Sequence, residues 1–213
     1  MQIKTLSVGQ FQANCYLIWD ENTRNCLIID PGDEADFITE EILRFALHPQ
    51  AILLTHGHYD HCLGCLEIKL NFDLPIYLNS KDNFLYQNAS KSATFWSATK
   101  ALKQPPTLPY PKTIKLGDET IKIISTPGHT PGSCCFLVSP VKERNGKAER
   151  DLNILFTGDT LFADTIGATN HVYSNSLDLR KSLKTLAKLP PETEIYPGHG
   201  ESSYLETALA TIS

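Results

Sequence analysis

The sequence predicts an α/β (α+β) protein with two mixed β-sheets and helices on their outer faces. Short apolar runs rich in β-prone residues recur along the chain, and polar turn residues separate them. Stretches of helical character follow several of these runs. Because hairpin-like pairs of runs occur together with helices, we expect two sheets with helices outside, although periodicity alone does not fix the topology.

Length and composition predict one globular domain that covers residues 1–213. Hydrophobic residues make up 41%, charged residues 20%, and the net charge is -5, so no electrostatic feature favours a nucleic-acid partner. The N-terminal residues lack the apolar run of a secretory signal, and no stretch approaches the roughly 20 apolar residues of a membrane span. We therefore expect a cytoplasmic protein without a membrane partner.

The first half begins with three expected strands, at 3–8, 15–19 and 26–30, and the third ends at the turn sequence D-P-G-D. In residues 35–46 the apolar side chains recur at helical spacing, which predicts a helix with one buried face. The apolar run at 51–55 predicts a strand covered on both faces. Further on we expect a strand at 75–79, a loosely packed helix through 80–104 and a proline-rich segment at 105–111.

The second half repeats the alternation. Ser174 and Ser176 are candidate caps for its helix. The segment 139–151 is charged and poor in apolar residues, which predicts an exposed loop or hairpin. The expected elements are strands at 120–126, 134–138, 153–159 and 194–200 and a helix at 177–189.

The segment L-L-T-H-G-H-Y-D-H-C-L-G-C, residues 53–65, allows two interpretations. Its histidines and aspartate could hold a metal, and its cysteines, Cys62 and Cys65, have the spacing of half a zinc knuckle or of a redox dithiol. No second C-x-x-C completes a four-thiolate site, and the cysteines follow His61 in an expected helix. Buried packing thiols are therefore the favoured interpretation, also for the other cysteines of this chain.

Further metal-competent side chains stand at other strand ends. His129, Asp159 and His199 each follow an expected strand and lie next to glycines that let the backbone turn tightly. Two cages can be assembled from these residues and the first cluster. His56, His58 and His129 would hold one metal; Asp60, His61 and His199 would hold a second; Asp159 would bridge both.

Such a pair of sites implies hydrolysis. A water shared by two divalent cations loses a proton near neutral pH and becomes a hydroxide that attacks a carbonyl or phosphoryl centre. We therefore expect two divalent metal ions, zinc foremost with iron or manganese as alternatives, and we expect Asp60 and Asp159 to be the catalytic carboxylates. His48, far from the motifs, is expected in a surface loop, and Tyr59 either lines the mouth of the site or packs.

Four ordered segments resemble the metallo-β-lactamase superfamily: T-H-G-H-Y-D-H at 55–61, T-P-G-H-T-P-G-S at 126–133, F-T-G-D-T-L-F at 156–162 and Y-P-G-H-G at 196–200. The resemblance implies an αββα sandwich with the metal site at one edge. The second and third segments look most like the hydroxyacylglutathione hydrolase (glyoxalase II) group, whose members cleave S-acylglutathione thioesters. This resemblance implies a small-molecule thioester substrate and the same seven metal ligands.

Two departures from that group concern the substrate. The sequence has 14 residues after His199, where the full-length thioester hydrolases carry a helical glutathione-binding extension, so it resembles their short, single-domain relatives. Where many relatives have G-R-T-D, this chain has Ala168 and Asn170 in place of arginine and aspartate. The strongest contact for a carboxylate-bearing substrate is thereby lost. His171 or Tyr173 could donate a hydrogen bond to the substrate instead.

Two other functions stay open. A persulfide dioxygenase with one iron would share the histidine motif, although the altered arginine segment counts against it. A noncatalytic metal-binding module is disfavoured because all seven ligand positions are intact. β-Lactam hydrolysis is disfavoured by His61 and by the expected absence of export, and a flavodiiron-type oxygen reductase would carry glutamate in place of His58.

Overall fold

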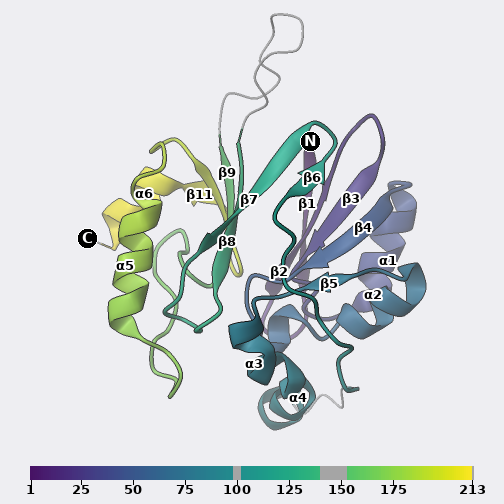
Figure 1. Ribbon diagram of the computed structural model, residues 1–213, viewed down its shortest axis with the longest axis horizontal. Helices are drawn as coiled ribbons and strands as arrows, with labels where there is room; N and C mark the ends of the chain where they lie inside the picture. The colour runs from purple at the N-terminus through teal and green to yellow at the C-terminus, as the bar shows by residue number, and fades with distance from the viewer. Residues whose placement is uncertain (98–101, 140–152, 213) are drawn as a thin grey trace, which may run out of the picture. The chain divides into compact units, whose positions relative to one another are not determined.

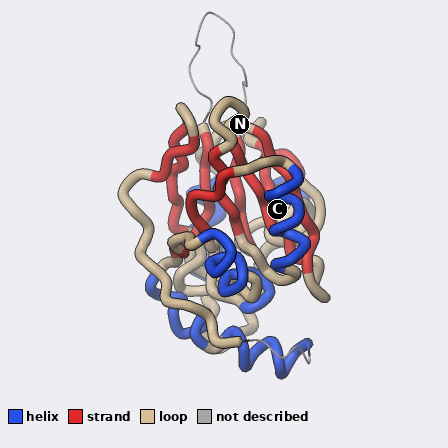
Figure 2. Tube along the Cα trace, turned by 90° about the vertical axis from the view of Figure 1, so that its right-hand side faces the viewer, coloured by secondary structure: helices blue, strands red, loops and turns tan. Residues whose placement is uncertain are grey.

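The computed structural model describes residues 1–97, 102–139 and 153–212. The chain forms two compact units, Met1–Tyr110 and Pro111–Ser213, and each contains one mixed sheet (Figures 1 and 2). The assignment of residues 1–213 to a single domain stays a prediction. Within the described part of the chain, no helix has the length and apolar character needed to cross a membrane.

The N-terminal unit has a five-stranded sheet in the order β1-β2-β3-β4-β5. The first three strands pair antiparallel, and the last three run parallel. The strands are β1 Gln2–Val8, β2 Ala13–Trp19, β3 Asn25–Ile29, β4 His48–Leu53 and β5 Ile76–Tyr77. The helices are α1 Ala35–Arg44, α2 Cys65–Phe72, α3 Asn83–Gln87 and α4 Ala89–Ser97, with short 3₁₀ turns η1 Tyr59–His61 and η2 Ser80–Asp82.

Helices α1 and α2 cover one face of this sheet (Figure 1). Ile38 and Ile42 of α1 and Ile68 of α2 are fully buried in one cluster with alternate residues of the central strands. Such a face removes several large side chains from water, each worth about 1.5–3 kcal/mol, and so fixes β3 and β4 as a rigid base. The loops that follow these two strands therefore leave from fixed points.

The C-terminal unit has a six-stranded sheet in the order β11-β10-β9-β8-β7-β6, in which only β9 and β10 pair parallel. Helices α5 and α6 pack on it through Leu186, Leu205 and Ala208. The strands are β6 Ile114–Leu116, β7 Glu119–Ser125, β8 Cys134–Val138, β9 Ile154–Gly158, β10 Glu194–Pro197 and β11 Ser203–Tyr204; the helices are α5 Ser176–Leu186 and α6 Leu205–Thr211.

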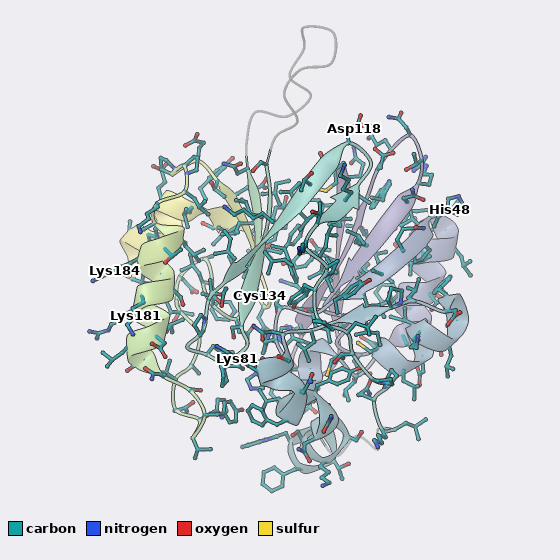
Figure 3. All side chains as sticks on the ribbon, in the orientation of Figure 1. His48, Lys81, Asp118, Cys134, Lys181 and Lys184 are labelled. Carbon is teal, nitrogen blue, oxygen red and sulfur yellow. The ribbon has the colours of Figure 1, made fainter. Side chains whose placement is uncertain are left out.

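Most expected elements are present, and the differences have local causes. Strand β4 begins at His48, which pairs with Asn25 of β3; His48 is therefore an exposed strand residue and not a loop residue (Figure 3). The cap of α5 is neither predicted serine: Asn175 accepts from the amides of Leu177 and Asp178, because an Asn oxygen reaches both donors. Residues 140–151 of the expected exposed loop lie outside the described residues.

Candidate metal centre

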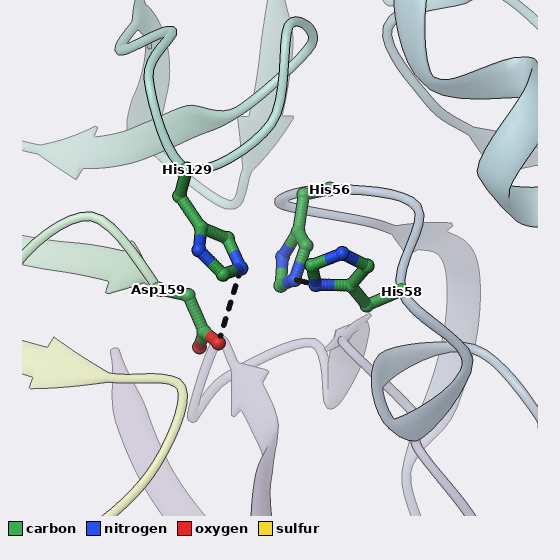
Figure 4. Close-up of side chains that lie close together, drawn as sticks. All are labelled: His56, His58, His129 and Asp159. Atoms are coloured by element: carbon green, nitrogen blue, oxygen red, sulfur yellow. Dashed lines mark hydrogen bonds and ion pairs between the residues drawn. The ribbon is translucent and has the colours of Figure 1, made fainter. Parts of the chain in front are cut away.

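His56 and His58 stand on the tight loop that follows β4. Gly57 separates them, and a Cβ atom at Gly57 would lie 2.7 Å from the backbone oxygen of Asp82, so only glycine fits there. The Gly57 amide donates to Asp82 Oδ2 over 3.0 Å, and Asp82 is fully buried. With the loop held in this way, His56 Nε2 and His58 Nδ1 lie 3.0 Å apart (Figure 4). Two ring nitrogens at this separation are close enough to bind the same metal ion.

Asp30 organises the same loop from the end of β3. Its carboxylate is buried and accepts the Thr55 amide over 2.7 Å, the Thr55 hydroxyl over 2.6 Å and His61 Nδ1 over 3.1 Å. Because a carboxylate can only accept, His61 carries its hydrogen on Nδ1 and leaves Nε2 as the ligand atom. His61 Nε2 in turn lies 3.9 Å from Asp60 Oδ2.

The same chain of hydrogen bonds orients His56. The Thr55 hydroxyl gives its hydrogen to Asp30, so its oxygen accepts from His56 Nδ1, 3.0 Å away. His56 Nε2 then carries no hydrogen and is the ligand atom, as in metal sites where the second ring nitrogen donates to a protein acceptor. The N-terminal unit thus presents His56, His58, Asp60 and His61 as one cluster of nitrogen and oxygen donors.

The C-terminal unit presents the other three predicted ligands. Strands β9 and β10 run parallel and end side by side, so Asp159 and His199 leave the same edge of the sheet. Asp159 Oδ2 lies 3.5 Å from His129 Nε2 (Figure 4). Asp159 Oδ1 lies 3.9 Å from His199 Nε2. Each oxygen of this carboxylate therefore faces a different imidazole, which is the arrangement a bridging ligand needs.

His129 is oriented by the segment that replaces G-R-T-D. Its Nδ1 donates to the Ala168 carbonyl over 2.9 Å, which leaves Nε2 as the ligand atom. Ser174 Oγ donates to the His129 carbonyl over 2.7 Å. Gly167 packs so tightly that a Cβ atom would lie 1.9 Å from the Asp159 backbone oxygen and 3.0 Å from His129 Cβ. This segment thus fixes His129 and Asp159 through its backbone.

Two residues that position the ligands had not been singled out from the sequence. Asp30 was part of a turn signal only, and Asp82 lay in a stretch interpreted as loosely packed helix. Both are buried aspartates whose partners are 25 or more residues away in the chain. Asp30 could have been found from its place at the end of an expected strand, the same kind of position that marked Asp159. The sequence around Asp82 contains no comparable signal.

His171 and Tyr173, the predicted substrate-binding residues, stack on each other with ring centroids 5.2 Å apart and planes 10° apart. The ring centroid of His171 lies 6.2 Å from that of His129. Burial lowers the pKa of His171, and the neighbouring charge of His129 lowers it further, so the neutral form is favoured. A neutral imidazole offers a hydrogen bond without a fixed positive charge.

The thiols behave as packing residues. All six cysteines are free and buried. Cys62 and Cys65 belong to the apolar cluster of the N-terminal unit, and burial raises the pKa of both thiols well above the usual value. A protonated thiol is neither a good ligand nor a nucleophile. Helix α2 begins at Cys65, so Cys62 lies just before it and not inside the helix as the spacing had predicted.

Comparison with known proteins decides the family. A family model described as the metallo-beta-lactamase superfamily matches residues 8–140. The chain belongs to the metallo-β-lactamase superfamily. Hydroxyacylglutathione hydrolase GloC of Haemophilus influenzae is 33% identical over 205 residues, 94% of this chain and 91% of that protein. The probable polyketide biosynthesis zinc-dependent hydrolase BaeB of Bacillus velezensis is 32% identical over 200 residues, 93% of this chain and 77% of that protein.

A solved structure supports the same assignment. The di-iron-bound form of TTHA1623 is 32% identical, with a TM-score of 0.82 over 98% of each chain. This similarity confirms the predicted fold class, two mixed sheets with helices. The superfamily is one of metal-dependent hydrolases, and the donors described above, imidazole nitrogens, three of them held in defined tautomers, and carboxylate oxygens, fit divalent metals of the zinc, iron and manganese kind.

Proposed function

We propose that this protein is a thioester hydrolase that uses two divalent metal ions, zinc foremost. The observation that carries the proposal is the carboxylate of Asp159, whose two oxygens face two different imidazoles at 3.5 and 3.9 Å. A carboxylate placed in this way can bind two metal ions at once, one through each oxygen. His56, His58 and His129 would hold one ion, and Asp60, His61 and His199 the other, with Asp159 between them.

The metal pair would supply a hydroxide and polarise the thioester carbonyl. The protein residues then have three tasks. Asp30 and the Ala168 carbonyl hold His61 and His129 in the tautomers that expose Nε2. Asp82 keeps His56 and His58 at a fixed separation through Gly57. A ligand set that is rigid before the substrate arrives needs no rearrangement during the reaction.

The choice of a thioester is supported by similarity to hydroxyacylglutathione hydrolase GloC, and the stacked pair His171 and Tyr173 is the proposed substrate contact. The acyl product would be a carboxylate, and the leaving group a thiol. No protein nucleophile is required, which agrees with the buried, protonated cysteines of the described core. The cytoplasmic location stays a prediction.

The test uses purified protein loaded separately with zinc, iron and manganese. We expect at least one form to release thiol from S-lactoylglutathione or from a simpler acyl thioester. Asp159→Asn should reduce turnover roughly a hundredfold or more and lower the metal content from two ions towards one. Asp164→Asn, an exposed aspartate of the same turn, is the matched control and should leave both unchanged.

Two outcomes would overturn this proposal. Consumption of oxygen with glutathione persulfide, together with no thiol release from any thioester, would identify an iron oxygenase. No turnover in any metal form, with two ions bound, would identify a noncatalytic metal-binding module. Metal stoichiometry distinguishes these outcomes from a simple failure to load the protein.

A further inference from the structure

A small pocket lies in the N-terminal unit beside Asp60, and none of the other proposed metal ligands lines it. It lies between the β1–β2 turn, the loop that follows β3 and the 3₁₀ turn η1. Its apolar lining residues include Phe11, Tyr59 and Leu63, and its acidic lining residues are Asp33 and Asp60. Because Asp60 is a proposed metal ligand, anything bound in this pocket is adjacent to the reacting centre.

The aromatic wall of the pocket consists of two rings. Phe11 and Tyr59 meet edge to face, with centroids 6.0 Å apart and planes 88° apart. Phe11 is 46% exposed, although it is a large apolar residue at the tip of a hairpin. An exposed aromatic ring next to a second ring provides a surface on which an apolar or cationic group gains free energy by leaving water.

The hairpin that carries Phe11 is held in place. Gln12 donates its amide to the Gly9 carbonyl over 3.1 Å and has a φ of 51°. The Gly9 amide donates to Glu34 Oε2 over 2.8 Å, which ties the hairpin to the loop before α1. Glu34 itself has a φ of 50°, a conformation that costs a non-glycine residue free energy and persists only when its surroundings enforce it. These hydrogen bonds therefore hold the hairpin side of the pocket in one conformation.

The acidic residues that line the pocket favour a bound group with positive charge. Its described lining residues include two aspartates and no lysine, arginine or histidine. Asp33 is not one of the proposed metal ligands, so a metal bound at Asp60 leaves this second acidic residue in the lining. A carboxylate would meet like charge there, while a cation would meet both the carboxylate and the negative faces of the rings.

We propose that this pocket, formed by Phe11, Tyr59, Leu63, Asp33 and Asp60, binds a positively charged, apolar arm of the substrate, such as a quaternary ammonium group. The inference rests on the proposed thioester hydrolysis for its catalytic consequence. It assigns to the substrate a charge opposite to that of the carboxylates of glutathione. The absence of arginine at Ala168 agrees with this assignment, because a cationic substrate has no use for a guanidinium.

The kinetic test compares three thioesters with the same acyl group: acetylthiocholine, S-acetyl-2-mercaptoethanol and S-acetyl-3-mercaptopropionate. They differ in the charge of the thiol arm, which is positive, neutral and negative. We expect kcat/KM to be highest for acetylthiocholine and to exceed that of the anionic ester by roughly threefold to tenfold. Asp33→Asn should reduce this ratio towards one, and Phe11→Ala should lower kcat/KM mainly for the cationic ester.

Asp36→Asn, an exposed aspartate on α1, is the matched control and should leave the ratio unchanged. A binding measurement separates the two proposals: choline chloride is titrated into metal-free protein and the ring signals of Phe11 and Tyr59 are followed by NMR. Shifts in the wild type that disappear in Asp33→Asn support the pocket even when no thioester is cleaved. Turnover of all three esters at equal kcat/KM, with no choline-dependent shifts, overturns the pocket and leaves the hydrolase standing.

Discussion

Asp30 and His61 are joined by a buried 3.1 Å hydrogen bond across 31 residues of sequence, and this bond fixes which nitrogen of His61 is available to a metal. Asp30→Asn removes the charge that favours this tautomer, while asparagine tolerates the φ of 48° found there. We expect metal affinity to fall roughly tenfold to a hundredfold. Competition with a chromophoric chelator measures it, and Asp36→Asn serves as the control; an unchanged affinity would contradict the role of Asp30.

Asp82 is predicted to act through the backbone of Gly57. Asp82→Ala leaves the buried Gly57 amide without this acceptor, which should cost about 1–3 kcal/mol of the free energy of unfolding. Asp82→Asn keeps one carbonyl oxygen and should recover most of the loss. Urea unfolding of the metal-free protein gives the free energies. Equal free energies of unfolding for the two variants would show that this hydrogen bond does not contribute to stability.

Gly167 and Ala168 form a matched pair of neighbouring positions. In Gly167→Ala the new Cβ atom would lie 1.9 Å from the Asp159 backbone oxygen, so the loop that carries Asp159 must move. We expect a metal content below two ions per chain and a loss of stability of about 1–3 kcal/mol. Ala168→Gly changes an exposed side chain and keeps the carbonyl that accepts from His129, so its metal content should equal that of the wild type.

Burial raises the pKa of Cys26 to about 12 from an ordinary value of 9.0. The folded state therefore keeps this proton at pH values where the unfolded chain has lost it, and the contribution to stability falls as the pH rises from 9 to 12. In that window the wild type should lose up to about 1.4 kcal/mol per pH unit more than Cys26→Ala. Parallel curves of unfolding free energy against pH for the two proteins would refute the prediction.

The ligand residues were predictable because strand ends are visible in the sequence. The apolar run before His56 and the glycines beside His129, Asp159 and His199 marked each position without any knowledge of the contacts. Their partners were not predictable. The acceptors of His61 and His129 are a carboxylate 31 residues away and a backbone carbonyl 39 residues away, and no local pattern encodes such pairs.

Three short elements were also not predicted from the sequence. Strands β6 and β11 have three and two residues, and α6 has seven, so each is too short for a periodic signal. Their order in the sheet comes from tertiary pairing. The pocket at Phe11 was missed for a different reason: a phenylalanine in a polar turn gives no sign of whether it is covered or exposed.

The six buried thiols are also a reporter of motion. Cys15, Cys26, Cys62 and Cys65 lie in the N-terminal unit, and Cys134 and Cys135 lie in the C-terminal unit. A reagent that modifies thiols can reach each of them only when the surrounding structure opens, so the rate of modification at each site measures the free energy of that opening. Local opening of the two units can therefore be measured separately with the native cysteines, and no cysteine has to be introduced by mutation.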